Sequence, residues 1–228
     1  MTTNAAHPLL AALMFTLALT AAARADWLYD AAGNSITNQH WKIYVTAAGT
    51  NLTIVGVSPP RPLTPTALPL ADPIIDSDGT AYALVAIGGS ILSVFGGTDP
   101  AYSSSVQSVT LPDTLLSIGN RAFGYCYALT SAIIPASVTN IGRGAFADST
   151  SLTEIMVAPG NPAYKDIGGV LFDTGAIALI QCPGGKTGHY TIPAGVTDIN
   201  TSAFSRCANL TGVSFPDSVA SIGYAALQ

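Results

Sequence analysis

One phrase of apolar and small residues occurs twice between residues 109 and 157. Its slots are an apolar residue before a proline, a segment that ends in Ile-Gly, an Ala-Phe pair and a leucine. Corresponding slots are 23 residues apart (135 − 112 and 146 − 123). The two copies comprise Leu111-Pro112, Leu115 to Gly119, Ala122-Phe123, Cys126 and Leu129, then Ile134-Pro135, Val138 to Gly142, Ala145-Phe146, Ser149 and Leu152. A fixed interval of about 20–29 residues predicts a solenoid, in which each copy forms one rung and stacking buries a shared core.

Each rung is expected to contain two short strands and a short helical turn, so the predicted fold is a mainly β leucine-rich-repeat solenoid of period 23. The first strand ends before the proline, as at residues 132–134, because proline lacks the donor that a sheet ladder needs. The second strand ends in Ile, as at residues 138–141. The residue after that isoleucine predicts a left-handed turn, since Gly and Asn tolerate positive φ. It is Gly119, Gly142, Asn200 and Gly223 in the four copies. The helical turn then carries Ala-Phe into the core.

Alternation along the first strands separates an inner from an outer face. The inner positions are Val109 and Leu111, Ala132 and Ile134, Ile155 and Val157, Tyr190 and Ile192, and Val213 and Phe215. The outer positions are Ser108 and Thr110, Ser131 and Ile133, Glu154 and Met156, His189 and Thr191, and Gly212 and Ser214. The outer positions predict one continuous sheet surface, named here the ladder face. We expect a partner to bind on it, at Thr110, Ile133, Glu154, Met156, His189, Thr191 and Ser214.

The third rung is longer than the others, with 35 residues from Ala158 to Pro193 (193 − 158, or 23 + 12). The additional segment predicts a β-hairpin, with strands at residues 170–172 and 178–180 and a turn at residues 173–175. Insertions in solenoids often contribute to binding. A wider rung without a binding role fits the pattern equally well.

The start of the chain predicts a targeting segment. Residues 9–23 form an uncharged run of 15, which is shorter than the roughly 20 residues of a membrane-spanning helix. The run ends in an Ala-x-Ala sequence before Asp26, which predicts a signal peptide over residues 1–25. Residues 1–8 contain no Lys or Arg, so a retained membrane anchor is the alternative.

Two further domains follow. Residues 26–83 predict an N-terminal β cap, in which a hairpin at residues 41–55 covers the first rung and a proline-rich connector occupies residues 58–73. The connector could instead dock a proline-recognising module. Residues 84–228 predict the solenoid, and its last repeat is truncated at Gln228. Either another molecule closes that end or the sequence is part of a longer reading frame, which is the interpretation we favour.

Composition narrows the choice of partners. The chain is 49% hydrophobic and only 9% charged, against roughly 25% charged in ordinary soluble domains. Removal of residues 1–25 leaves 7 basic groups (8 − 1) and 13 acidic groups, a net charge of −6. The basic residues are scattered, whereas nucleic-acid binding needs clustered Lys and Arg. We therefore expect no nucleic-acid partner.

The three cysteines, Cys126, Cys182 and Cys207, form no C-x-x-C motif. They therefore predict neither a zinc site nor a dense disulfide framework, and no other feature predicts a cofactor. Cys126 and Cys207 occupy the same slot, three residues after the Phe of the Ala-Phe pair. We expect small buried hydrophobes, with a disulfide in an oxidising compartment as the alternative.

The recurring Ile-Pro, Val-Thr-x-Ile-Gly, Ala-Phe and Cys-x-x-Leu phrase resembles the BspA-type bacterial leucine-rich repeat family. The long rung resembles that family too, through residues 161–165, residues 169–173 and Cys182-Pro183. The resemblance covers residues 84–228, and the phrase is broken at Ser149, Asn200 and Leu227. It implies a secreted or cell-surface protein for adhesion or protein–protein recognition, and it implies no catalytic residue.

We therefore expect a secreted or cell-surface protein that binds a protein or another surface macromolecule, without catalysis, cofactor or a membrane span in the mature chain. One alternative is a ligand-free structural module of a larger surface protein, because the last rung is cut short. A further alternative is a glycan-active hydrolase, since glycosidases use two carboxylates. Its candidate groups are Glu154, Asp166, Asp173 and His189. Solvated turn residues explain the two aspartates more simply, because they flank the predicted hairpin.

Overall fold

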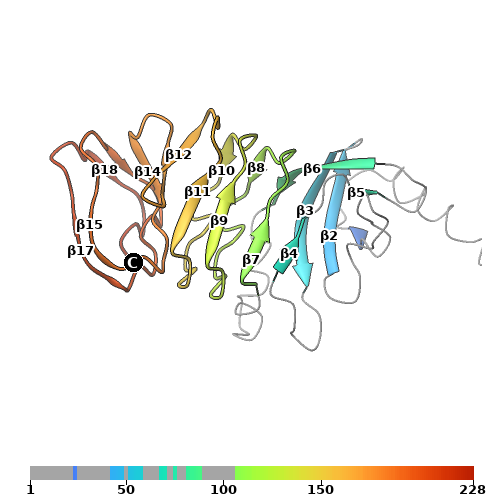
Figure 1. The fold of residues 1–228 in the computed structure, drawn as a ribbon, viewed down its shortest axis with the longest axis horizontal. Coiled ribbons are helices and arrows are strands. Elements are labelled where there is room, and N and C mark those ends of the chain that lie inside the picture. Colours follow the sequence, from blue (N-terminus) through green and yellow to red (C-terminus); the bar gives the residue numbers. More distant parts are fainter. Residues whose placement is uncertain are drawn as a thin grey trace, which may run out of the picture.

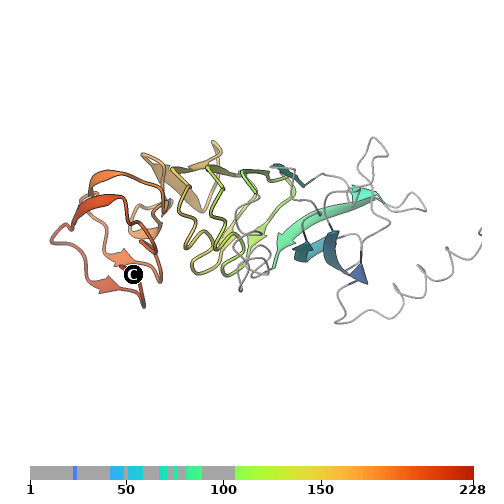
Figure 2. The same ribbon diagram turned by 90° about the horizontal axis from the view of Figure 1, so that it is seen from below.

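The computed structural model describes residues 81–88 and 106–228, together with Leu70 and five earlier strands. These strands are β1 (Ala23–Arg24), β2 (Lys42–Ala48), β3 (Asn51–Ser58), β4 (Ala67–Pro69) and β5 (Ile74–Ile75). The molecule is an elongated stack of rungs (Figures 1 and 2). The described residues contain strands and turns but no helix, which confirms the mainly β solenoid. The first, second, long, fourth and fifth rungs begin at Pro112, Pro135, Ala158, Pro193 and Pro216.

The strands that end in isoleucine stack in parallel, as a set of three and a set of two in separate sheets, and together form what we name the isoleucine ladder. Its strands are β6 (Ala81–Ile87), β8 (Ser117–Ile118) and β10 (Asn140–Ile141), then β16 (Asp198–Ile199) and β18 (Ser221–Ile222). Ile87 pairs with Ile118, and Ile118 pairs with Ile141, so equivalent slots lie in register. The apolar segment that ends at Ile87 therefore forms an incomplete turn at the start of the stack.

The other strand of each rung contributes to the ladder face. These strands are β7 (Ser108–Thr110), β9 (Ser131–Ile134), β11 (Glu154–Val157), β15 (Gly188–Thr191) and β17 (Leu210–Ser214). Their inner and outer positions alternate as predicted: Ile134 and Ile155 are fully buried, whereas Ile133 is exposed. Phe215 is the exception among the inner positions, since 40% of its surface is exposed. It directly precedes Pro216, where the fifth rung begins, and no later strand of the ladder face packs against it in the described structure.

The long rung adds an antiparallel unit of three strands. These are β12 (Tyr164–Ile167), β13 (Val170–Asp173) and β14 (Ala178–Gln181). The predicted hairpin is confirmed, since β13 pairs antiparallel with β14, with a bulge between Leu171 and Phe172. β12 was not predicted. β14 then rejoins the isoleucine ladder, because Leu179 pairs with Ile199 in parallel.

The Ala-Phe pairs fill the core, as predicted. Phe123 and Phe146 are fully buried, and their ring centroids lie 5.3 Å apart with nearly parallel planes. The expected helical turn is absent from the described residues, which form hydrogen-bonded turns there. Alternate N–H groups of the segment donate to carbonyls of the next rung: Arg121 to Arg143, Phe123 to Ala145 and Tyr125 to Ala147. Donors that a helix would use internally thus join neighbouring rungs.

The residues after the isoleucines do not form left-handed turns, so that prediction was wrong. None of Gly119, Gly142, Asn200 and Gly223 has a positive φ. Positive φ occurs two residues later, at Arg121 (51°), Gly144 (58°), Ser202 (57°) and Ala225 (52°). A Cβ at Gly142 would lie 2.4 Å from the backbone nitrogen of Asn120. The glycine is needed because neighbouring rungs approach closely there.

The N-terminal strands extend the isoleucine ladder. β2 and β3 form the predicted antiparallel hairpin, from the pair Lys42 and Ser58 to the pair Ala48 and Asn51. β3 pairs in parallel with β6, and β1 pairs with β2. β1 falls inside the predicted signal peptide. The remainder of residues 1–25 and most of the proline-rich connector lie outside the described residues.

Candidate recognition surface

The ladder face carries an apolar spot at its centre. Ile133 on β9 is 54% exposed, and it lies directly opposite the half-buried Met156 on β11. Glu154, two residues before Met156, is exposed and pairs with Ser131. Thr110 is exposed on β7, which lies beside β9 (Figure 1). Four of the seven candidate residues, Thr110, Ile133, Glu154 and Met156, are therefore brought together on three neighbouring strands.

The other three candidates form a separate polar group on β15 and β17. The exposed His189 places its Nε2 atom 2.8 Å from Ser214 Oγ, and Thr191 pairs directly with Ser214. Gly212 lies under the imidazole, since a Cβ at that position would be 3.0 Å from His189 Nδ1. The absence of a side chain at Gly212 therefore lets the ring lie close to the strand and reach Ser214.

The predicted continuous face is divided between these two groups, so that prediction was wrong. β9 pairs with β11 and β15 pairs with β17, but β11 does not pair with β15. Ile155 N–H donates instead to Gly169 O (2.9 Å), and Val157 N–H donates to Asp166 Oδ1 (3.0 Å). The β12–β13 hairpin therefore takes up the donors with which β11 would have bonded to another strand. A sequence pattern does not reveal this, because both partners belong to the insertion.

The aspartates proposed for a hydrolase have structural partners. Asp166 accepts the bond from Val157, and Asp173 Oδ1 accepts hydrogen bonds from the N–H groups of Ile177 and Ala178 (both 2.8 Å). Within the described residues, no carboxylate hydrogen-bonds His189, and no three His, Cys, Asp or Glu side chains gather as a metal site would require. Both aspartates thus have a structural role. Asp173 ends β13 and closes the hairpin turn, as the sequence suggests, whereas Asp166 lies within β12 and is not a turn residue.

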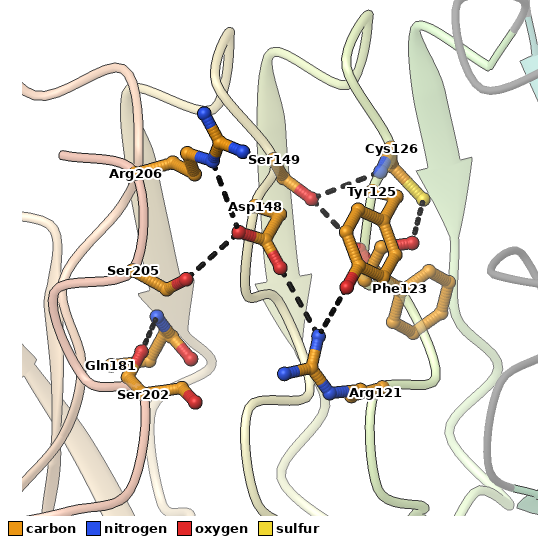
Figure 3. A network of polar contacts seen from close by, with 11 residues as sticks. Arg121, Phe123, Tyr125, Cys126, Asp148, Ser149, Gln181, Ser202, Ser205 and Arg206 are labelled. Atoms are coloured by element: carbon orange, nitrogen blue, oxygen red, sulfur yellow. Dashed lines mark hydrogen bonds and ion pairs between the residues drawn. The ribbon is translucent and has the colours of Figure 1, made fainter. Parts of the chain in front are cut away.

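A polar network on the turn side of the solenoid was not predicted (Figure 3). Asp148 is buried, and its Oδ2 accepts a hydrogen bond from Arg121 Nη1 at 3.1 Å. Its Oδ1 accepts a hydrogen bond from Ser205 at 2.8 Å and lies 3.8 Å from Arg206 Nε. Arg121 also donates to Tyr125 Oη at 3.0 Å. The network therefore joins the first, second and fourth rungs.

The long rung allows this bridge because its own turn is short. Cys182 follows Leu179 by three positions (182 − 179), whereas Phe123 follows Ile118 by five (123 − 118). The turn of the second rung therefore lies against that of the fourth, and a Cβ at Gly144 would lie 3.5 Å from Ser202 Cβ. A signal for the network exists in the sequence, since Tyr125, Asp148 and Arg206 share one slot and the last two carry opposite charges.

The cysteines partly follow expectation. Cys126 and Cys182 are buried, Cys207 is half-buried, and all three thiols are free. Burial raises the pKa of the Cys126 thiol. Ser149 replaces cysteine in the second rung, where its hydroxyl donates to Phe123 O (2.8 Å) and accepts from Cys126 N–H (3.2 Å). The slot therefore accepts either cysteine or serine.

No helix among the described residues is long and apolar enough to cross a membrane. The stacked rungs, the two parallel ladders and the exposed strand face define a repeat protein of the leucine-rich class. The family model described as BspA type leucine rich repeat region matches residues 101–187 and 184–228 in six copies, more than half of the sequence. The chain therefore belongs to this family.

Several solved structures are similar to this chain. A leucine-rich repeat protein from Eubacterium ventriosum superposes with a TM-score of 0.55 and 18% identity, over 86% of this chain and 62% of that one. A leucine rich cell surface protein from Faecalibacterium prausnitzii gives 0.44 and 20%, over 83% and 72%. Pneumococcal vaccine antigen PcpA gives 0.42 and 14%, over 88% and 78%. No curated protein matches the chain. The first likeness shows the fold, and this chain spans less than two thirds of that protein's length.

Proposed function

We propose that this chain is an exported surface protein that binds a protein partner through β7, β9 and β11 of the ladder face. The observation that carries the proposal is the pairing of Ile133 with Met156 in the middle of this surface. Ile133 is 54% exposed although its two neighbours in sequence, Ala132 and Ile134, are almost fully buried. An apolar side chain held outward by a rigid strand loses little conformational entropy when a partner covers it.

The composition of the surface favours a protein partner. At protein–protein interfaces, most of the binding free energy comes from a few apolar or aromatic residues that are enclosed by polar ones. Ile133 is positioned to be such an anchor, and the flexible thioether of Met156 can adapt to the partner's shape. The surrounding Ser131 and Thr110 are uncharged, so their desolvation costs little compared with that of charged groups. Glu154 at the edge supplies one charge for orientation of the partner.

Export and domain boundaries belong to the same proposal. Residues 1–25 would be removed as a signal peptide, residues 26–83 would cap the stack and residues 84–228 would present the surface. Membership of a leucine-rich repeat family supports a binding role. N-terminal sequencing of the secreted chain tests export directly: a start at Asp26 is expected, and retention of Met1 in a membrane fraction would support the anchor alternative.

Two double variants test the binding surface. Ile133→Asp with Met156→Asp places charge on the ladder face, whereas Leu116→Asp with Ile177→Asp places it at similarly exposed apolar positions, 50% and 52%, next to the isoleucine ladder. Both proteins are immobilised and presented to a panel of purified secreted and surface proteins. Loss of a single anchor worth 2 kcal/mol weakens affinity about 30-fold, so the first variant should lose at least that much and the second almost nothing. Equal binding by the two variants would contradict the proposal, and no binding by the unmodified chain would favour a ligand-free structural module.

A further inference from the structure

Two cysteines that are distant in sequence lie together in the described structure. Cys182 occupies the Phe slot of the long rung, and its N–H donates to Ala203 O at 2.7 Å, as Phe123 N–H donates to the rung after it. Cys207 Sγ lies 3.7 Å from Cys182 O and 3.4 Å from Pro183 O. Cys182 Sγ lies 3.9 Å from the same Pro183 oxygen. Both sulfur atoms therefore contact the same carbonyl oxygen.

We propose that Cys182 and Cys207 form a disulfide that fastens the long rung to the fourth rung when the exported chain meets an oxidant that itself carries a disulfide. Cys207 lies three residues past Phe204, the residue opposite Cys182, and the turn returns its Sγ to within 3.7 Å of Cys182 O. A disulfide spans Cα separations of about 4.4–6.8 Å. Because both sulfur atoms already contact Pro183 O, the bond needs rotation of two side chains rather than movement of one rung past another.

The exposure of the two cysteines determines which of them reacts first. Cys207 is half-buried and lines a hollow of about 350 Å³ with Phe204, Leu210 and Leu227, whereas Cys182 is fully buried. The Cys207 thiolate attacks one sulfur of the oxidant's disulfide, which forms a mixed disulfide and releases one thiolate. Cys182 then loses its proton, attacks the Cys207 sulfur and releases the second thiolate. The two cysteines lose two protons and two electrons, and the oxidant is reduced to two thiols.

Among the groups that act on the Cys182 thiol, Lys186 favours the thiolate that the second step requires. The hydrogen bond with the Cys207 thiol and burial raise the pKa of the Cys182 thiol, and the Lys186 ammonium opposes this rise. Formation of the mixed disulfide removes the Cys207 thiol, so the effect of Lys186 gains weight at the moment when a thiolate is required. Lys186 is held nearby by a hydrogen bond to Gly168 O (2.8 Å) and by contact with the Tyr190 ring (5.6 Å to its centroid). Lys186 is therefore a positioning residue for this reaction.

Cys126 provides the internal control. It shares a slot with Cys207, but the contact of its sulfur is Gly124 O at 3.9 Å, within its own rung. Cys126 is in the first rung and Cys207 is in the fourth. A bridge between these two cysteines would have to cross the second and long rungs, so we expect Cys126 to stay a thiol.

Peptide mapping tests the bridge in the full chain. The purified reduced protein is equilibrated with a mixture of oxidised and reduced glutathione, alkylated and digested with trypsin, which cleaves after Lys and Arg. Each cysteine then lies on a separate peptide, residues 122–143, 166–186 or 207–228. We expect a cross-link between the second and third peptides, and alkylated Cys126 on the first.

Variants and unfolding temperature complete the test. Cys126→Ser should keep the cross-link, Cys182→Ser should leave glutathione attached to Cys207, and Lys186→Gln should accumulate that mixed disulfide. The oxidised unmodified chain should unfold about 5–10 °C above the reduced chain, as expected for a loop of this length in a protein of this size. Glutathione on Cys207 of the unmodified chain without the cross-link, a cross-link to Cys126, or one formed only between chains would overturn the proposal. These results do not depend on export or on the ladder face.

Discussion

Asp148 accepts a hydrogen bond from Arg121 at 3.1 Å, and this bond joins the turns of the first two regular rungs. The carboxylate is buried, and its second oxygen is bonded to Ser205 in the fourth rung. Asp148 has a φ of 64°. Its short side chain makes this backbone conformation acceptable and also brings the charge between its partners. One residue therefore ends a turn and joins three rungs.

Asp148→Asn should lower the free energy of unfolding by about 1–3 kcal/mol, because hydrogen bonds to a charged group are replaced by weaker neutral ones. Asparagine tolerates the same positive φ, so the backbone is not the cause of the loss. Urea denaturation under reducing conditions measures it. The exposed Asp217, replaced in the same way, is the control and should leave the unfolding midpoint unchanged. An equal shift in both variants would mean that the network adds no stability.

Phe146→Ala should destabilise the chain by about 3–5 kcal/mol, since it empties a buried aromatic site and removes the stack on Phe123. Thermal and urea unfolding measure the change. Tyr224→Ala, at a position that is 83% exposed, is the matched aromatic control and should shift stability by no more than about 0.5 kcal/mol. Unchanged unfolding of the Phe146 variant would show that the Ala-Phe slot does not support the core.

Asn161→Ala should loosen the long rung from the second rung. The Asn161 amide donates to Pro135 O (2.8 Å) and Val138 O (2.9 Å), and its Oδ1 accepts from the N–H groups of Ala163 and Tyr164. Loss of these four bonds should cost about 2–4 kcal/mol. Hydrogen exchange should report faster exchange of the Ala163 and Tyr164 amides. The exposed Asn209, replaced by Ala, should alter neither stability nor exchange; a change of the same size there would argue against this role.

The carboxylate of Asp198, on the isoleucine ladder, predicts a dependence of stability on pH. The Ser221 hydroxyl, and with it the Thr197 hydroxyl, donates to the Asp198 carboxylate and lowers its pKa below the ordinary value. A lowered pKa means that the contribution to stability is present above the ordinary pKa and is lost as the pH falls through the lowered value. Ser221→Ala should raise the pKa of Asp198 toward its ordinary value, as measured by a carbon-detected NMR titration. Ser214→Ala, on the other ladder, should not move it. An unchanged Asp198 titration in the Ser221 variant would contradict the assignment.

The period and the faces could be predicted because the shared core imposes them. A slot that recurs every 23 residues must stack on its equivalent, so Phe123 and Phe146 are buried and Ile133 points outward as expected. Glycine is less informative, since the same residue type serves positive φ and close approach. At Gly142 the approach of Asn120 is the reason, and the left-handed residue is Gly144. Sequence spacing alone does not separate the two roles.

The division of the ladder face could not be predicted, because it depends on where an insertion places its polar groups. Asp166 and Gly169 belong to the long rung and accept hydrogen bonds from β11. Nothing in the sequence of β11 distinguishes it from the other strands of the ladder face. The network around Asp148 has a clearer signal in the sequence. Opposite charges in one slot of a stacked repeat, as at Asp148 and Arg206, predict an ion pair if a shortened rung allows the two to meet. The short turn of the long rung allows this contact, and it is recognised only once the structure shows that Leu179 is equivalent to the ladder isoleucines.

Site-specific photo-crosslinking tests the recognition surface most directly. A benzophenone-bearing amino acid replaces either Ile133 or Leu116, which are 54% and 50% exposed on different sides of the solenoid. Each chain is mixed with a purified surface protein that bound in the panel, and is illuminated. The account predicts a cross-linked complex from position 133 and almost none from position 116. Stronger cross-linking from position 116, or binding that persists without any cross-link from position 133, would contradict it.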